Sequence, residues 1–481
     1  MSKSSAKRVL SVAPMPPEKI AYALARYSRS PDSIRDSIEW VRTHDSSKFL
    51  DSFYFQYGHA SIADLGHLTL CFEGISELAA TEIEDEPLWD GQARSTRYQN
   101  FDRSGFVAPP EFNPEEAARY EECALGLLEA YRKIHGLTVE ILREELPRPE
   151  SMKPDAYERN LAARAFDVAR YCLFFGVRTG VGQVVSIRTL EKQIRRMRAS
   201  EYRELRELGE EAAAVCAEPA TCALGEHSGE PLAPTLAKYV QPDEHLRQAH
   251  ADLQLWAKQN LGSLHLDGAE GVPDVDLLKP TDTSSDITAS LLYSVTALPY
   301  RVLYEECRYW SEAKRAEVID AALKSRSDRD ELLRNFRGGP YVFDIRMDLG
   351  AYRDMHRHRR CVQVRKPFHM VRGYSVPEKI ELNSELARIY HSSMEKVSQT
   401  VQSLPSPGAE YLLPFASLGR FLFKMDFAEA EYICRLRSGT KGHFSYRKVA
   451  WEMAEKLRAA EPELSRLIRA TPPWQQDLLM R

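Results

Sequence analysis

The sequence predicts two comparable domains of mixed helix and strand in tandem, and three observations support this. The chain has 481 residues, more than one ordinary hydrophobic core accommodates, and its 43% hydrophobic and 28% charged residues are a globular composition. Residues 90–98 and 353–360 are two arginine-containing segments that look like fragments of one motif. The order of the predicted elements also repeats. A duplicated gene that divided one site between its copies would have this arrangement.

The two segments are complementary. Residues 90–98 end in Ser-x-Arg-Tyr, but residues 85–87 (Asp-Glu-Pro) stand where a basic triplet would precede it. Residues 357–359 are a basic triplet, Arg-His-Arg, but the chain continues into Pro-Phe-His-Met at 367–370 where Ser-x-Arg-Tyr would stand. We therefore interpret the two segments together.

Both halves of the chain predict the same order of elements. The first half predicts a helix over 18–41, apolar segments of mixed spacing at 61–72 and 78–84, a long helix over 114–146, and a helix pair over 186–197 and 201–215. The second half predicts helical sequence over 287–323, an element over 341–351, a helix from 378 to 401, and a helix pair over 427–437 and 444–457. Between them, residues 218–286 are rich in Pro, Gly and Asp, which predicts a linker. We place the domains at 1–245 and 246–481.

Composition excludes several classes of protein. The net charge of −5 and pI near 6.3 do not indicate nucleic-acid binding by the whole chain. No apolar run approaches the ~20 residues that span a bilayer, and residues 9–13 are too short an apolar stretch for a signal peptide. We therefore expect a cytoplasmic protein without a membrane segment. The eight cysteines form no Cys-x-x-Cys and mostly have apolar neighbours, which favours reduced, buried thiols over disulfides or a zinc site.

The basic segment 353–372 has four open interpretations. Guanidinium groups bind phosphate oxygens bidentately, so the segment could hold the diphosphate of a dinucleotide. It could also be a solvated basic loop. A metal site has suitable ligand types but lacks an acidic partner among many cations, and an RNA-binding patch lacks the aromatic residues that stack on bases. Glycine-rich phosphate motifs are absent, so side chains would hold any nucleotide. The candidate metal ligands are His356, His358, Cys361 and His369.

Further short segments point to one family. Residues 58–64 (Gly-His-Ala-Ser-Ile-Ala-Asp), 169–173 (Ala-Arg-Tyr-Cys-Leu) and 186–190 (Ser-Ile-Arg-Thr-Leu) lie in the first half, and 413–414 (Leu-Pro) and 434–437 (Cys-Arg-Leu-Arg) in the second. In this order they resemble the flavin-dependent thymidylate synthases, as a tandem fusion over most of the chain. The signature of that family, Arg-His-Arg-x-x-Ser-x-Asn-x-x-Ser-x-Arg-Tyr, is complete in neither copy.

The resemblance implies a fold and an activity. The implied fold is α+β, two copies each with a mostly antiparallel sheet and long helices, packed as a pseudo-dimer, with two chains forming a pseudo-tetramer. The implied enzyme is an FAD-dependent methyltransferase of dTMP biosynthesis, in which NADPH reduces bound FAD and methylenetetrahydrofolate supplies the carbon that converts dUMP to dTMP. The flavin carries the difficult step, so no protein nucleophile is needed.

The resemblance also implies site residues, divided between the copies. In that family two subunits build each nucleotide site, and this chain keeps complementary parts, so we expect one composite site and a degenerate reciprocal site. Met197 and Glu410 stand where the degenerate site would need arginine. The implied catalytic residue is Arg437; the nucleotide ligands are Ser95, Arg97, Arg170, Arg353, Asp354 and Arg357; and the flavin ligands are His59, Ser61, Arg188, Arg357, His358 and Arg359.

Asp354 stands where the family has a glutamine beside the base. An anionic Asp354 would repel a uracil oxygen but could accept a hydrogen bond from an exocyclic amino group. Two alternatives therefore stay open: a catalytically inactive flavin- or nucleotide-binding homologue, and a flavin- and folate-dependent enzyme acting on another pyrimidine or on RNA. Whether the composite site forms within one chain or between chains also stays open.

Overall fold

The computed structural model describes residues 15–27, 33–46, 60–97, 104–219, 231–238, 240–244, 273–278, 282–293, 300–323, 334–337, 339–371 and 373–476, together with residues 100, 101, 229, 332 and 479. The chain divides into two compact units. Unit 1 consists of residues 1–73, 82–93 and 180–262, and unit 2 of residues 74–81, 94–179 and 263–481. The boundary expected near residue 245 lies outside the described residues, so the division into 1–245 and 246–481 stays a prediction.

Unit 1 is built around a three-stranded sheet of order β1-β3-β2. From His67 to Phe72 the residues of β1 are alternately exposed and buried, the pattern of a strand with one face on a core. β2 pairs antiparallel with β3. The strands are β1 (His67–Ser76), β2 (Asp90–Ala93) and β3 (Arg178–Ser186). The helices are α1 (Pro17–Tyr27), α2 (Ile34–Thr43), η2 (Ala60–Leu65), α7 (Ile187–Arg198), α8 (Arg203–Ala217) and α9 (Pro234–Ala237). α4 (Glu77–Ile83) follows β1 directly and has residues in both units.

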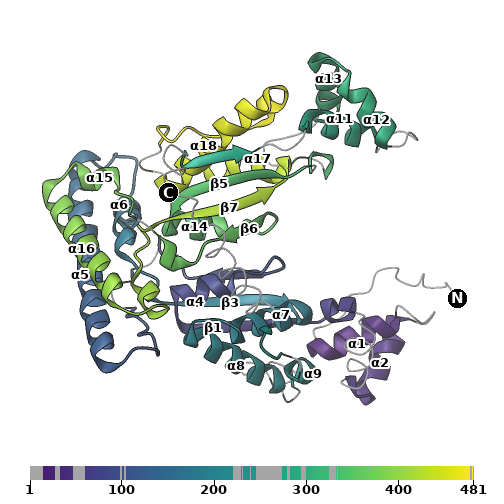
Figure 1. Cartoon of the computed structure of the whole chain (residues 1–481), viewed down its shortest axis with the longest axis horizontal. Helices are drawn as coiled ribbons and strands as arrows, with labels where there is room; N and C mark the ends of the chain where they lie inside the picture. The colour runs from purple at the N-terminus through teal and green to yellow at the C-terminus, as the bar shows by residue number, and fades with distance from the viewer. Residues whose placement is uncertain are drawn as a thin grey trace, which may run out of the picture. The chain divides into compact units, whose positions relative to one another are not determined.

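Unit 2 contains a four-stranded antiparallel sheet of order β4-β5-β7-β6. The strands are β4 (Val275–Leu278), β5 (Tyr341–Asp348), β6 (Val362–Arg365) and β7 (Leu418–Met425). Three helices accompany them, α14 (Leu349–His356), α17 (Phe427–Arg437) and α18 (Phe444–Ala460). α18 packs against β4 and β5, and α14 packs against β5 and α18 (Figure 1). This layer brings the end of β5, and the start of α14, to the candidate site.

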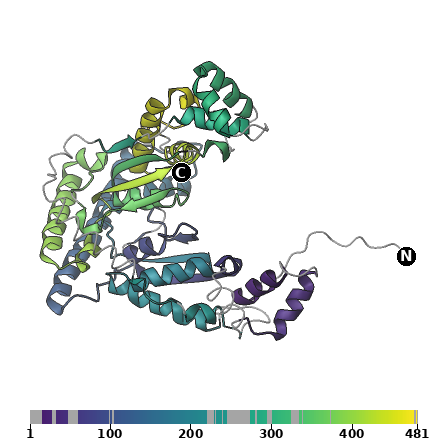
Figure 2. The same ribbon diagram turned by 45° about the vertical axis from the view of Figure 1, so that its right-hand side comes forward.

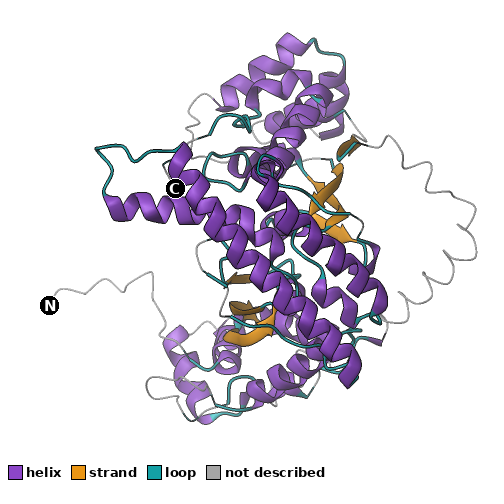
Figure 3. Ribbon diagram, turned by 90° about the vertical axis from the view of Figure 1, so that its left-hand side faces the viewer, coloured by secondary structure: helices purple, strands orange, loops and turns teal. Residues whose placement is uncertain are grey.

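Long helices form a second part of unit 2. α5 (Pro114–Glu145) begins at Asn113, whose side chain accepts from the backbone amides of Glu115 and Glu116 in a capping box. α5 packs against α6 (Pro154–Ala169) and against α16 (Ser384–Ser403), as the views from two sides show (Figures 1 and 3). The short helices nearby are η3 (Arg170–Cys172), η6 (Phe368–Met370), α15 (Glu378–Glu381), η7 (Gly408–Leu412) and η8 (Pro462–Leu467).

The segments after η3 and η7 contact each other reciprocally. The Phe175 amide donates to the Leu413 carbonyl at 3.1 Å, and the Phe415 amide donates to the Leu173 carbonyl at 2.7 Å. Phe174 and Pro414 form an antiparallel bridge between these bonds. Exchange of equivalent bonds is the pattern of a two-fold contact, here between two parts of one chain.

The structure confirms several predicted elements and corrects others. The long helix predicted over 114–146 is α5, and the pair predicted over 427–437 and 444–457 is α17 and α18. A single helix over 18–41 is wrong, because Ser33 caps a second helix, α2, with Asp36 completing the capping box. The helix predicted from 378 to 401 is divided into α15 and α16, because the Asn383 side chain accepts from the Glu385 and Leu386 amides and caps a new helix.

The helical sequence predicted over 287–323 is present as separate helices. This region contains three helices, seen as a cluster in Figure 2, and the Ser311 side chain accepts from the Lys314 amide where the third begins. These helices are α11 (Thr283–Tyr293), α12 (Tyr300–Arg308) and α13 (Glu312–Leu323).

The described cysteines are all free thiols, and all are buried except Cys71. This agrees with the expectation of reduced, buried thiols. Burial raises the pKa of Cys172, and likewise that of Cys361, to about 12, so these two are neutral at physiological pH. Within the described part of the chain, no helix is long and apolar enough to cross a bilayer.

Candidate active site

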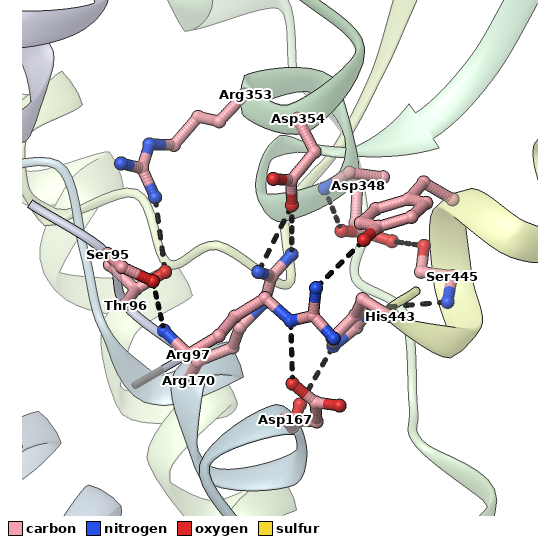
Figure 4. Close-up of polar contacts among 12 residues, drawn as sticks. Ser95, Thr96, Arg97, Asp167, Arg170, Asp348, Arg353, Asp354, His443 and Ser445 are labelled. Carbon is pink, nitrogen blue, oxygen red and sulfur yellow. Dashed lines mark hydrogen bonds and ion pairs between the residues drawn. The ribbon is translucent and has the colours of Figure 1, made fainter. Parts of the chain in front are cut away.

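The candidate site is centred on Asp354, in the helix that follows β5. Arg170, in η3, donates from Nη1 and Nη2 to Asp354 Oδ2 at 3.2 and 3.3 Å. These two residues are 184 positions apart in one chain and both belong to unit 2. The side chain of Arg170 is 1% exposed and that of Asp354 is 18% exposed. Figure 4 shows the pair and its surroundings.

Asp354 is ionised because arginines surround it. Burial acts to raise the pKa of Asp354, but the charges of Arg170, Arg97, Arg437 and Arg357 act against it, and the resulting pKa lies below the ordinary value. Two of these arginines precede residue 245 and two follow it. The site is therefore a locus of positive charge assembled from both halves of the sequence, which suits an anionic ligand.

Arg97 is also held in place within unit 2. Its Nε donates to Asp167 Oδ1 at 3.0 Å, its Nη1 to the Tyr446 hydroxyl at 2.8 Å, and its Nη2 to the Lys441 carbonyl at 3.0 Å. The guanidinium carbons of Arg97 and Arg437 lie 5.7 and 5.6 Å from the centre of the Tyr446 ring. Arg97 is thus buried and oriented, with its charge shared between Asp167 and the neighbouring ring.

Asp348, the last residue of β5, joins the start of α14 to η3 and α18 through its hydrogen bonds. It caps α14 by accepting from the Ala351 amide at 2.7 Å, and it accepts hydrogen bonds from the hydroxyls of Tyr171 and Ser445. Burial raises the pKa of Asp348 even though these donors and Arg170 oppose the shift. The cap fixes where α14 begins and therefore where Asp354 lies.

His443 is a neutral structural residue. Burial, with the charges of Arg170 and Arg97, holds its pKa well below the ordinary range. Its Nδ1 accepts from the Ser445 amide at 3.2 Å, so Nε2 carries the proton and donates to the Asp167 carbonyl at 2.9 Å. This histidine joins the start of α18 to the end of α6.

A chain of three residues orients Arg437. Arg437 donates from Nε to His358 Nε2 at 2.7 Å, and His358 Nδ1 lies 3.3 Å from Glu429 Oε1. Burial lowers the pKa of His358, and Arg437 adds to this, whereas Glu429 opposes it. A neutral His358 accepts from Arg437 and donates to Glu429, so this network sets the direction of the Arg437 guanidinium.

The remaining predicted ligands of unit 2 differ in exposure. Arg353 pairs with Glu77 at 2.7 Å and lies over the Phe415 ring, 4.8 Å from its centre. The Ser95 hydroxyl accepts from the Arg97 amide at 3.3 Å. The Arg357 side chain is exposed and makes no hydrogen bond or ion pair with the described residues, while Arg359 is half-buried.

Three predicted flavin ligands, His59, Ser61 and Arg188, belong to unit 1. Arg188 pairs with Asp64 at 3.1 Å, and each side chain is 39% exposed. His59 lies outside the described residues, as does the side chain of Ser61. Of the twelve predicted residues, the structure brings together eight within unit 2: Ser95, Arg97, Arg170, Arg353, Asp354, Arg357, His358 and Arg437.

Sequence reasoning missed the residues that hold the arginines. Asp348 has a signal that could have been found, an acid at the end of a strand and directly before a helix, which is typical of an N-cap. Asp167 and Glu77 lie within helical sequence, and only the fold shows that each faces an arginine. The missed residues are Glu77, Asp167, Tyr171, Asp348, Glu429, His443, Ser445 and Tyr446.

Gly350 is required for the approach of Arg170 to α14. A Cβ on Gly350 would lie 2.9 Å from Arg170 Nη2 and 3.2 Å from Asp348 Oδ1. We expect Gly350→Ala to destabilise the protein by about 1–3 kcal/mol, because the buried ion pair must shift. Gly136→Ala is the matched control, since a Cβ there meets nothing within 4 Å, and it should stabilise α5 by about 0.5–1 kcal/mol. Urea unfolding measures both; equal effects would contradict this role of Gly350.

Comparison with known proteins places the chain in a family. The family model described as "Thymidylate synthase complementing protein" matches residues 9–220 and 291–463, together more than half of the chain. The UPF0159 protein of Chlamydia muridarum is 24% identical over 448 residues, covering 90% of this chain and 81% of the relative. The UPF0159 protein of Thermoplasma acidophilum is 24% identical over 495 residues, covering 93% of this chain and 94% of the relative.

Solved structures give a weaker similarity. The flavin dependent thymidylate synthase ThyX from Helicobacter pylori, complexed with FAD and dUMP, has 16% identity and a TM-score of 0.27, covering 41% of this chain and 88% of that chain. The UMP/dUMP methylase PolB from Streptomyces cacaoi, bound with 5-Br dUMP, has 13% identity and a TM-score of 0.33, covering 42% of this chain and 99% of that chain. On the strength of the two matched segments, this chain belongs to the thymidylate synthase complementing family, the flavin-dependent thymidylate synthases, and carries two copies of the family domain in tandem.

Proposed function

We propose that this protein is an FAD-dependent methyltransferase that converts dUMP to dTMP with methylenetetrahydrofolate and NADPH, at one composite site. The observation that carries the proposal is the convergence of four arginines on Asp354, two from each matched segment. Such a cluster supplies charge-assisted hydrogen bonds for a nucleotide phosphate and for a polarised base. We further propose a cytoplasmic homodimer in which four domain copies form a pseudo-tetramer.

The exposed side chain of Arg357 fits an anionic cofactor. The Arg357 side chain is exposed, makes no hydrogen bond or ion pair with the described residues, and follows α14 directly, so its planar fork is available to the diphosphate of FAD. Arg359 belongs to the same turn. Bound flavin supplies hydride chemistry that no side chain of this cluster can perform.

The protein's own residues bind and orient the substrate. Arg97 and Arg170 would hold the 5′-phosphate, and their pairs with Asp167 and Asp354 keep both guanidinium groups in place before the nucleotide arrives. Arg437, directed by His358, would face the edge of the pyrimidine and stabilise negative charge as the ring is polarised. Burial of Arg97 and Arg170 excludes water from that end of the site.

The ionised state of Asp354 favours a second candidate substrate. An anionic carboxylate cannot donate to a uracil carbonyl, whereas it accepts from the amino group of cytosine. We expect Asp354→Gln to strengthen binding of dUMP relative to dCMP, because an unmatched polar contact in a desolvated site costs about 1–3 kcal/mol. Calorimetric titration of both nucleotides against both proteins tests this. An unchanged ratio of affinities would show that Asp354 does not contact the base.

Flavin binding is the first requirement of the proposal. Purified protein should carry FAD, seen in its visible absorbance, and Arg357→Ala should weaken FAD binding by about 1.5–3 kcal/mol, since a charge-assisted bond to phosphate is lost. Arg188→Ala serves as a comparison for the flavin ligand predicted in unit 1. A colourless protein with no FAD-induced thermal shift would contradict the proposal and favour the alternative of a catalytically inactive homologue.

Growth tests the reaction itself. Expression of the gene in a thymidine auxotroph should restore growth without thymidine if the product is dTMP. A flavin-bound protein that fails to rescue growth would direct attention to another pyrimidine or to RNA as the substrate.

A further inference from the structure

A cavity in unit 2, called here the second cavity to distinguish it from the arginine cluster, shares no lining residue with that cluster. Its volume is about 650 Å³, and its wall is formed by α16, by the loop around η6, and by η7 with the residues after it. The lining combines apolar and polar side chains. Those that matter here are His369, Met394, Val397, Val401, Glu410 and Leu413.

The chain's internal duplication shows what this cavity corresponds to. Leu173 and Leu413 are equivalent in the reciprocal hydrogen bonds described above, and Arg170 and Glu410 each lie three residues before them in the helices η3 and η7. Likewise, Arg97 lies four residues after the end of β2, and His369 lies four residues after the end of β6. β2 and β6 are equivalent, since each pairs antiparallel with the strand that follows its η helix.

The charge is reversed at one of these two pairs of equivalent positions. Where the first site has Arg170, fully buried, the second cavity has Glu410, which is 3% exposed and accepts from the Ser406 hydroxyl at 2.6 Å. Where the first has Arg97, the second has His369. A buried carboxylate repels a phosphate and attracts a cation, so this cavity cannot be a second copy of the phosphate site.

We propose that this cavity binds a small organic cation with an apolar body. The ammonium or amidinium group would lie against the Glu410 carboxylate, and the apolar body would pack on Met394, Val397 and Val401 of α16. Charge complementarity selects the cationic group, and the apolar wall supplies affinity that a bare metal ion or polyamine could not use. The equivalent position of the first copy holds Arg170, so the two copies differ in the class of ligand that this position can bind.

The probe for this proposal is 1-naphthylmethylammonium, whose fluorescence reports binding, with 1-naphthylacetate as its anionic match. At neutral pH we expect saturable binding of the ammonium and none of the acetate. Glu410→Gln should weaken the binding of the ammonium by about tenfold or more. Glu410→Arg, which restores the residue of the first copy, should reverse the preference.

Two further observations keep the test decisive if the substitutions at Glu410 do not fold. Val401→Trp fills the cavity from α16, leaves Glu410 in place, and should abolish ammonium binding. Ammonium-induced broadening of assigned resonances should be confined to residues lining the cavity. Equal binding of both probes, or binding that survives Val401→Trp, would overturn the proposal. None of these readouts depends on FAD or on turnover, so they stand apart from the proposed methyl transfer.

Discussion

Replacing Arg170 with methionine is expected to destabilise the protein by about 3–5 kcal/mol, because it leaves the Asp354 carboxylate buried without its closest cation. Methionine keeps most of the side-chain volume, so the loss is one of charge and hydrogen bonds. Urea unfolding or thermal melting measures the effect. The matched control is Arg188→Met, which removes an ion pair whose partners are each 39% exposed and should cost at most about 1 kcal/mol.

A double variant tests whether the loss of stability comes from the unpaired charge of Asp354. Asp354→Leu added to Arg170→Met removes the stranded charge, so the double variant should be more stable than Arg170→Met alone. If Arg170→Met costs no more than Arg188→Met, the pair does not hold unit 2 together. A double variant less stable than the single would show that the two residues act independently.

Substitution of either Arg97 or Arg437 by alanine is expected to lower kcat by about 10²–10³-fold, because each removes a positioned donor from one site. The double variant should be no worse than the more damaged single variant, since residues that act as a unit are not additive. Both guanidinium groups lie beside the ring of Tyr446 in one chain. Mixing the two single variants should therefore restore no activity.

Two outcomes would contradict a shared site. If about half of the activity survives in each single variant, the two copies work independently. If mixing restores activity, the site forms between chains. The control for folding is Lys396→Ala, which removes an exposed pair with Glu122 on the surface of α16 and should leave turnover unchanged.

The arginines of the site can be predicted from the sequence more readily than the carboxylates and other groups that bind these arginines. An unusual cluster of charged residues can be recognised in the sequence itself. The family resemblance, confirmed by two matched segments, then indicates which of these residues belong to one site. The carboxylates opposite them are ordinary helical acids until the chain folds. Asp167 contributes its carboxylate to Arg97 and its carbonyl to His443, and neither role has a local sequence signal.

The fold was predicted to a similar depth. The α+β class, which the resemblance implied, and the long helix over 114–146, which periodicity predicted, were right. α2 begins at a capping box, which is a local feature. The apolar pattern over 18–41 continues across it, so the pattern alone predicted one helix where there are two. The composite nature of the cluster was inferred from complementary gaps in a motif, and the pairing of Arg170 with Asp354 within one chain could come only from coordinates.

The reciprocal hydrogen bonds of Phe175 and Phe415 have a consequence for how the arginine cluster responds to dilution. In an enzyme whose site is formed by two separate subunits, the site is lost when the protein concentration falls below the dissociation constant of the two subunits. Here the peptide chain connects the two contributors, so their encounter is a first-order event with a high effective concentration. The cluster should persist at any dilution at which the chain stays folded, even where larger assemblies have come apart.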